Sequence, residues 1–199
     1  MSQRIVNVGL IGFGLSGRYF HAPFLSVMEG FRLKGVVERN RNEAQEFDPA
    51  IENHRTIDSL LDDRDIDVVF ICTPNETHFD YAVRALEKGK HIVIEKPFTL
   101  HEEEAAEIFD LAKRKGLMAT AYQNRRWDSD FLTVQKIISE GKIGKVVEFE
   151  SRYDRYRPLP VKNTWKEQGG VGAGNVYNLG PHLIDQALVL FGAPQTVTA

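Results

Sequence analysis

The sequence predicts an α/β protein built on a doubly wound parallel sheet. Short apolar runs rich in β-branched residues alternate with helical patterns through residue 122. Strands are expected over 4–11, 31–37, 66–72, 91–94 and 117–122. Helices are expected over 15–28, 57–61, 79–88 and from Thr99 or His101 to 115. This alternation indicates one parallel sheet with helices on both faces, and a glycine triplet after the first strand supports it.

The glycine triplet Gly12, Gly14 and Gly17 joins the first strand to the helix after it. This order points a helix N-terminus at a pyrophosphate, as in Rossmann-type dinucleotide-binding sheets. Gly12 allows the tight turn, Gly14 lets the backbone approach the phosphates, and Gly17 lets the helix pack on the strand. Such triplets also occur in ordinary turns, so the interpretation depends on the strand–helix context. The rest of the expected cofactor loop is Phe13, Leu15 and Ser16.

Two residues of the expected helix 15–28 need separate comment. Pro23 lies inside the helical pattern and is expected to bend or break it. His21 precedes it closely, and we interpret this histidine as a packed or capping side chain rather than a ligand.

Glu38 closes the second strand, 21 residues after Gly17. A dinucleotide fold places near this position the acid that accepts hydrogen bonds from the adenosine ribose. Arg39 follows it, and its guanidinium could stack on adenine or pair with a 2′-phosphate. The alternative is an ordinary strand-end acid beside a solvated arginine. The acid favours NAD, and the arginine leaves NADP open.

Polar side chains also follow the third and fourth strands, at the sheet edge where parallel sheets bind ligands. Thr73, Pro74, Asn75 and His78 form a turn after residues 66–72. Glu95 and Lys96 follow residues 91–94. We expect both groups to contact the cofactor, although helix capping would also explain Thr73, Asn75 and His78.

Composition and charge set outer limits on function. The 199 residues are 42% hydrophobic and 27% charged, which is ordinary for a globular protein, and the net charge of -3 gives no reason to expect nucleic acid.

Cys72 is the only cysteine, which excludes an internal disulfide and a multi-cysteine zinc site and fits a reducing compartment. His101 and the acidic run after it are interpreted as a solvated helix start, so no metal is expected. No apolar run is long enough for a bilayer, and we expect a cytoplasmic protein.

Residues 123–199 differ in character from the first part. We expect a helix over 131–140, a long strand over 146–156 and the start of another strand over 195–199. In the outer part of this strand, basic and aromatic residues alternate. Such a stretch could bind single-stranded nucleic acid, but we favour a role as a polar pocket wall or an exposed sheet face. A later helix would carry Asn178 and His182 on one face, because they are four residues apart.

Three stretches taken together resemble the Gfo/Idh/MocA oxidoreductases. They are residues 12–17, the turn 73–78 with 95–97, and the run from Gly169 to His182. Residues 124–133 and 154–158 look most like the bacterial scyllo-inositol dehydrogenase branch. The resemblance implies a dinucleotide-binding domain over 1–122 and, over 123–199, an incomplete α+β domain with a mainly antiparallel sheet. Members are longer, so we expect a truncated second domain, and the full-length protein is expected to form a dimer or tetramer.

The resemblance also implies chemical roles. Lys96 would hold a substrate oxygen near the nicotinamide, and His182 would act as general acid and base on the reacting hydroxyl. Asn178 stands where the family often has Asp, and an amide lacks the negative charge that stabilises imidazolium. Asp154 and Trp165 are expected to contact the substrate and Asn124 the cofactor.

The reaction implied is hydride transfer between NAD or NADP and a secondary hydroxyl of a cyclic polyol (an inositol) or a sugar. A dinucleotide-binding sensor or regulator, or a catalytically inactive fragment, is the alternative that Asn178 and the chain length leave open.

Overall fold

The computed structural model describes residues 4–154, 156, 158–159 and 170–198. The chain forms two compact units, Met1–Tyr122 and Gln123–Ala199, which are described separately. No helix in the described part of the chain is long and apolar enough to cross a bilayer.

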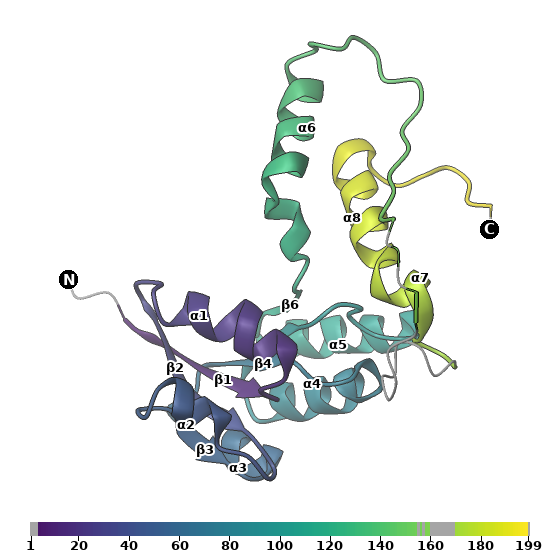
Figure 1. The fold of residues 1–199 in the computed structure, drawn as a ribbon. Coiled ribbons are helices and arrows are strands. Elements are labelled where there is room, and N and C mark those ends of the chain that lie inside the picture. The colour runs from purple at the N-terminus through teal and green to yellow at the C-terminus, as the bar shows by residue number, and fades with distance from the viewer. Residues whose placement is uncertain (1–3, 155, 157, 160–169, 199) are drawn as a thin grey trace. The chain divides into compact units, whose positions relative to one another are not determined.

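The first unit contains a six-stranded sheet in the order β3-β2-β1-β4-β5-β6 (Figure 1). Its strands are β1 (Val6–Ile11), β2 (Phe31–Val37), β3 (Glu52–His54), β4 (Val68–Ile71), β5 (His91–Ile94) and β6 (Ala119–Ala121). Every neighbouring pair is parallel. Chain order reverses between β1 and β4, which is the switch point of a doubly wound sheet. The predicted Rossmann-type sheet is therefore confirmed.

Sequence patterns missed the short edge strand β3. Its residues, Glu52, Asn53 and His54, are polar and show no apolar alternation. They form a strand because they pair with residues 35–37 of β2, a contact that local sequence does not encode.

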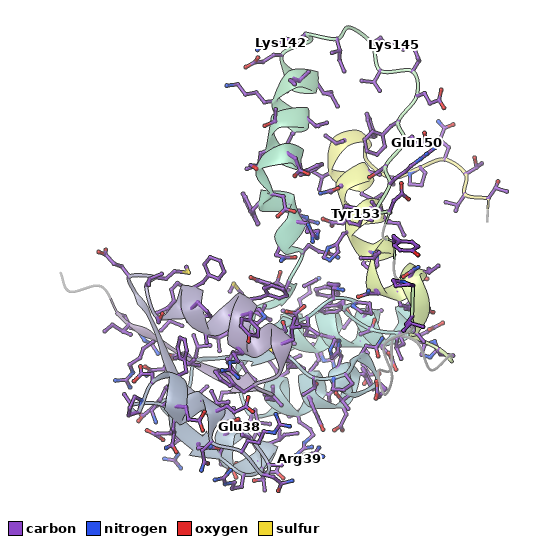
Figure 2. The ribbon with its side chains drawn as sticks, in the orientation of Figure 1. Glu38, Arg39, Lys142, Lys145, Glu150 and Tyr153 are labelled. Atoms are coloured by element: carbon purple, nitrogen blue, oxygen red, sulfur yellow. The ribbon has the colours of Figure 1, made fainter. Side chains whose placement is uncertain are left out.

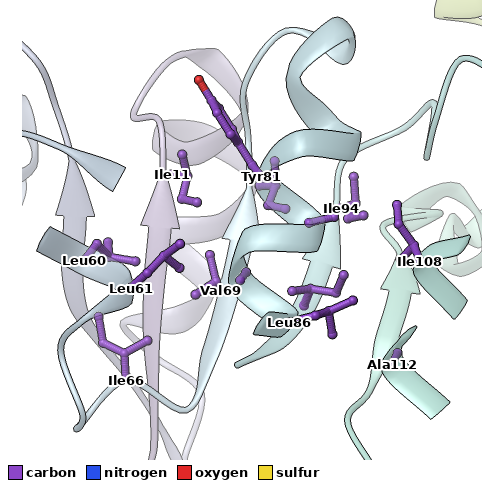
Figure 3. Packing of buried hydrophobic residues seen from close by; sticks show 14 of the residues in the cluster. Ile11, Leu60, Leu61, Ile66, Val69, Tyr81, Leu86, Ile94, Ile108 and Ala112 are labelled. Atoms are coloured by element: carbon purple, nitrogen blue, oxygen red, sulfur yellow. The ribbon is translucent and has the colours of Figure 1, made fainter. Parts of the chain in front are cut away.

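Helices cover both faces of this sheet. They are α1 (Ala22–Leu25), α2 (Glu43–Phe47), α3 (Ile57–Leu61), α4 (His78–Glu87) and α5 (Glu102–Lys115). Side chains of α3, α4 and α5 pack with Ile11, Val69 and Ile94 in one buried cluster (Figure 3). Side chains of α1 and α2 pack with Val8 and Leu10 in a second cluster. The two clusters are the two faces of one sheet, because strand side chains point alternately to opposite faces.

The helix predicted over 15–28 is shorter and irregular. A π-helical turn, η1 (Gly17–His21), precedes α1. Pro23 lies in the first turn of α1, where its missing N–H is tolerated. The expectation that Pro23 interrupts a regular helix agrees with this change from π to α geometry.

The described residues of the second unit form helices and no strand. They are η3 (Asn124–Trp127), α6 (Ser129–Ser139), α7 (Gly174–Asn178) and α8 (Gly180–Phe191). Arg126 donates to both carboxylate oxygens of Asp185, at 2.7 and 2.6 Å, and so joins η3 to α8.

The strand predicted over 146–156 is wrong for the described residues of that range, which carry no regular secondary structure. The same holds for the strand expected over 195–199, at residues 195–198. A strand requires a neighbour to complete its hydrogen bonds, and no described segment pairs with either one. Phe149 instead packs against Phe191 of α8, with ring centroids 5.3 Å apart.

Candidate functional site

A pocket of about 510 Å³ lies in the first unit, at the carboxyl ends of β1, β2 and β4. This is the sheet edge beside the switch point, where doubly wound sheets bind ligands. Of the residues predicted to bind cofactor, those that line the pocket are Gly12, Phe13, Gly14, Glu38, Arg39, Thr73 and Pro74. Leu15, Ser16, Gly17, Asn75, His78, Glu95 and Lys96 belong to the same unit but do not line this pocket, and Asn124 begins η3 of the second unit.

The glycine loop has the conformation that its sequence suggests. Gly12 has φ 96°, and a Cβ there would lie 3.1 Å from the carbonyl oxygen of Cys72. A Cβ on Gly17 would lie 2.6 Å from the carbonyl oxygen of Gly12, so a side chain would push η1 away from the loop. At Gly14, by contrast, no atom lies within 4 Å of the Cβ position. The open space there suits a phosphate group approaching the backbone.

The carboxylate of Glu38 is already engaged by the protein. It accepts hydrogen bonds from the backbone N–H of Glu43 at 3.2 Å and of Ala44 at 2.9 Å, in the first turn of α2. A third comes from the side-chain amide of Asn53 at 3.4 Å. Glu38 is only 6% exposed. Sequence spacing suggested a ribose acceptor and missed this role, because α2 and β3 were not expected.

Arg39 has a different environment from the acid beside it. Its side chain is exposed at the pocket rim and makes no hydrogen bond or ion pair with the described residues. Figure 2 shows Glu38 and Arg39 at the same end of the first unit. The loop that follows is held by Arg55, which donates to the carbonyl oxygens of Glu38 and Arg41 at 3.0 and 2.7 Å. The Arg39 guanidinium, which has no partner among the described residues, therefore lies beside a loop that Arg55 holds in place.

The turn after β4 is connected to the segment after β5. His78 is 1% exposed; its Nδ1 lies 2.9 Å from the carbonyl oxygen of Pro97, and its Nε2 lies 3.0 Å from that of Thr73. Asn75 is also buried. Both ring nitrogens of His78 thus face protein carbonyls, while Thr73 and Pro74 face the pocket.

Glu95 is the centre of a second polar cluster. One oxygen, Oε1, accepts from the hydroxyl of Ser16 and lies 2.8 Å from Nε2 of His21. Burial disfavours the charged carboxylate, but the hydrogen bonds from His21 and Ser16 outweigh it, and the pKa of Glu95 lies below its ordinary value. Burial, with Glu95 nearby, raises the pKa of the Cys72 thiol, which is consistent with an unreactive side chain.

The candidate residues of the second unit lie on separate helices. Asn178 ends α7, whereas His182 is a buried residue of α8. The single helix expected for this pair is wrong, because Leu179 interrupts it and Pro181 has no N–H to donate to the preceding turn. Asp154 is exposed, and Trp165 lies outside the described residues. Arg125 lies over the ring of Tyr153, 5.3 Å from its centroid.

Two family models match the chain in succession. The first, described as an oxidoreductase family with an NAD-binding Rossmann fold, matches residues 6–123. The second, the GFO/IDH/MocA C-terminal domain, matches residues 131–199.

Individual oxidoreductases are also similar to this chain. The oxidoreductase YdgJ of Escherichia coli is 44% identical over 193 residues, covering 97% of this chain and 56% of YdgJ. The scyllo-inositol 2-dehydrogenase (NADP(+)) IolW of Bacillus subtilis is 38% identical over 194 residues, covering 98% of this chain and 54% of IolW. Among solved structures, YvaA of Bacillus subtilis gives a TM-score of 0.91 at 36% identity, covering 98% of this chain and 55% of YvaA.

The chain spans about half the length of the curated relatives it matches. Its glycine loop, its strand order and both family matches lead to the same assignment. This chain belongs to the Gfo/Idh/MocA family of NAD(P)-binding oxidoreductases.

Proposed function

We propose that the protein is an NADP-preferring oxidoreductase that transfers a hydride between the nicotinamide and a carbon bearing a secondary hydroxyl of a cyclic polyol or sugar. The environment of Glu38 carries the cofactor preference. The carboxylate already accepts hydrogen bonds from two backbone N–H groups and a longer one from the Asn53 amide, so less of its accepting capacity is left for a ribose diol. The main reason to favour NAD from sequence is thereby weakened.

Arg39 supplies the positive side of the same argument. A 2′-phosphate is doubly charged or nearly so, and a guanidinium can donate two parallel hydrogen bonds to it. The Arg39 side chain is exposed at the pocket rim and has no competing partner among the described residues. The name of the relative IolW, an NADP(+)-dependent enzyme, agrees with this preference.

We place the dinucleotide in the pocket of the first unit. Gly12 and Gly14 would hold the pyrophosphate, Arg39 would hold the 2′-phosphate, and Thr73 and Pro74 would contact the bound cofactor. When bound, the nicotinamide accepts or returns the hydride.

The chain's own residues would supply the proton chemistry. Lys96 would donate a hydrogen bond to the substrate oxygen and fix its position. His182 would take the hydroxyl proton as the C–H bond gives up its hydride, and would return the proton in the reverse direction. Asn178 would hydrogen-bond near His182 without adding negative charge. Asp154 and Trp165 are proposed as further substrate contacts.

The substrate class is supported by relatives alone. IolW is named for scyllo-inositol, and the same protein matches nearly all of this chain. Asn178 favours one other candidate, a cofactor-binding sensor or an inactive form, because an amide cannot stabilise imidazolium by charge. Cytoplasmic location and homo-oligomer formation are part of the same proposal.

Cofactor titration tests the preference directly. We expect NADP to bind the chain at least about tenfold more tightly than NAD, and Arg39→Ala to remove most of that difference. Arg64→Ala is the matched control, because Arg64 is also exposed but precedes the amino end of β4, at the opposite sheet edge. Equal affinity for the two cofactors, or tighter NAD binding, would contradict the preference.

A polyol and sugar panel tests the reaction. We expect nicotinamide reduction with scyllo- or myo-inositol and its loss in Lys96→Ala. Tight NADP binding by the full-length protein without reduction by any inositol or aldose would instead favour the sensor, whereas reduction by the full-length protein but not by this chain would favour the inactive fragment.

A further inference from the structure

Two buried histidines of the first unit take no part in the proposed chemistry. His21 ends η1 and is 2% exposed, and His78 begins α4 and is 1% exposed. His21 follows the glycine loop, and His78 is the last residue of the 73–78 turn. Both reach the segment that carries Lys96.

His21 acts on the residue before Lys96. Its Nε2 lies 2.8 Å from Glu95 Oε1, which also accepts from the hydroxyl of Ser16 in the glycine loop. The other oxygen, Oε2, accepts from the backbone N–H of Lys96 at 3.2 Å. The Glu95 carboxylate therefore connects the glycine loop and η1 to the backbone of Lys96.

Aromatic contacts fix the orientation of the His21 ring. Its centroid lies 5.1 Å from that of Phe70 in an edge-to-face arrangement and 4.3 Å from that of Tyr122. The hydroxyl of Tyr122 donates to the carbonyl oxygen of Phe20 at 3.0 Å, so the ring packed on His21 is itself held by η1. A buried ring packed in this way keeps its nitrogen directed at Glu95.

His78 acts on the residue after Lys96. Its ring lies between the carbonyl oxygens of Pro97 and Thr73, at 2.9 and 3.0 Å. Carbonyl oxygens only accept hydrogen bonds, so the ring is the donor: to one of them when neutral, and to both when protonated. This contact ties the Lys96 segment to the 73–78 turn.

We propose that His21 and His78 are positioning residues that hold the two ends of the Glu95–Pro97 segment, so that Lys96 and the glycine loop keep a fixed relation to the bound cofactor. The inference rests on the proposed function, because it assumes a nicotinamide cofactor at this sheet edge. A side chain that buried hydrogen bonds already hold in place can bind a ligand without an entropic cost for ordering it. Removing those hydrogen bonds should therefore weaken the binding of ligands that contact that side chain. The adenosine 2′-phosphate end, held by Arg39, lies outside this network.

The test compares two ligands in the full chain. NADPH carries the pyrophosphate and nicotinamide, whereas adenosine 2′-monophosphate carries only the end that Arg39 would bind. Affinities are measured for His21→Leu, which keeps apolar volume but no donor, and for His21→Gln, which keeps an N–H. The same two substitutions are made at His78.

The matched control is His91→Leu. His91 lies at the amino end of β5, and its Nδ1 accepts from the backbone N–H of Met118 at 2.9 Å. The substitution removes a histidine hydrogen bond from the same strand, but at the opposite edge of the sheet from Glu95.

We expect each Leu variant to bind NADPH about tenfold more weakly and adenosine 2′-monophosphate within about twofold of the unsubstituted chain. The Gln variants should recover part of the loss, and His91→Leu should change neither affinity. A purely structural role would lower both affinities together or neither. If a Leu variant does not fold, its Gln variant gives the same comparison at smaller amplitude.

Two outcomes would overturn the inference alone: NADPH binding by all four variants as tightly as by the unsubstituted chain, or equal loss of affinity for both ligands. If the unsubstituted chain binds neither NADP nor NADPH, the proposed function itself fails, which is a separate result.

Discussion

The two units differ most in how many apolar side chains they bury. In the first unit both faces of the sheet carry clusters of fully buried residues, among them Leu10, Val69 and Ile94. In the described part of the second unit, Phe131 is the only buried hydrophobic residue, while Trp127, Ile184 and Phe191 are exposed. Burial of apolar surface is the main force for folding, so the first unit should hold most of the stability.

In the described part of the second unit, most of the buried residues are polar. The buried residues His182, Asp185 and Gln186 cluster on α8, and Arg126 and Gln186 join that helix to η3. The described part of the second unit is thus held together largely by hydrogen bonds and an ion pair. Each of these contributes less stability than a side chain buried in an apolar core. The comparison predicts different sensitivities to mutation in the two units.

The largest effect is expected in the core of the first unit. Ile94→Ala removes a side chain that is fully buried between β5 and its covering helices, and it should lower the free energy of unfolding by about 2–5 kcal/mol. Urea denaturation measures it. Leu188→Ala, at a half-exposed position of α8, is the control and should cost less than about 1 kcal/mol. Equal losses of unfolding free energy for the two variants would show that the second unit has a core that stabilises it as much as the core of the first unit does.

A smaller effect is expected from the ion pair of the second unit. Arg126→Ala leaves the carboxylate of Asp185, which is largely buried, without its two donors. We expect a loss of roughly 1–3 kcal/mol, measured as faster amide hydrogen exchange in α8 with unchanged exchange in β4. Arg152→Ala removes an exposed pair with Glu150 and serves as the control. An equal increase of amide exchange in β4 would mean that the substitution destabilises both units together.

The smallest effect is a pH dependence in the first unit. The pKa of Glu95 is lowered in the folded protein, because its hydrogen bonds to His21 and Ser16 outweigh burial. Folding therefore favours the ionised form. The resulting stability is fully present above the unfolded pKa, near 4.5, and is lost as pH falls through the lower folded pKa.

Melting temperatures of the unsubstituted chain and of Glu95→Gln, recorded from neutral pH down to acid, measure this contribution. The advantage of the carboxylate should shrink on acidification below the unfolded pKa. An advantage that grows there would contradict the sign.

Parts of the fold could be predicted closely because their signals are local. The bounds of β5 and α3 agree with the sequence pattern, since an apolar run and a short amphipathic turn are each flanked by polar residues or glycine. The strand predicted over 146–156 failed for the opposite reason. Alternating residues make a segment compatible with a sheet, but only a neighbouring strand makes it one, and none of the described segments provides it.

The candidate site shows the same division. Gly12, Gly14 and Gly17 could be assigned from spacing, because backbone geometry at a tight turn restricts which residue fits. The hydrogen bonds that Glu38 accepts could not be predicted from the sequence. Their donors belong to α2 and β3, two short elements that show no clear hydrophobic periodicity. The partners of His21 and His78 could not be predicted either, because Glu95 and Pro97 lie far from these histidines along the chain.

The order of residues along the chain was enough to predict a doubly wound sheet, a glycine loop at its switch point and membership of the Gfo/Idh/MocA family. Which polar side chains around that loop can contact a ligand depends instead on how segments distant in sequence pack together. The physical reason is that a hydrogen bond depends on distance in space. Glu38 and Arg39 are neighbours in sequence, yet packing against α2 engages one and leaves the other exposed at the pocket rim.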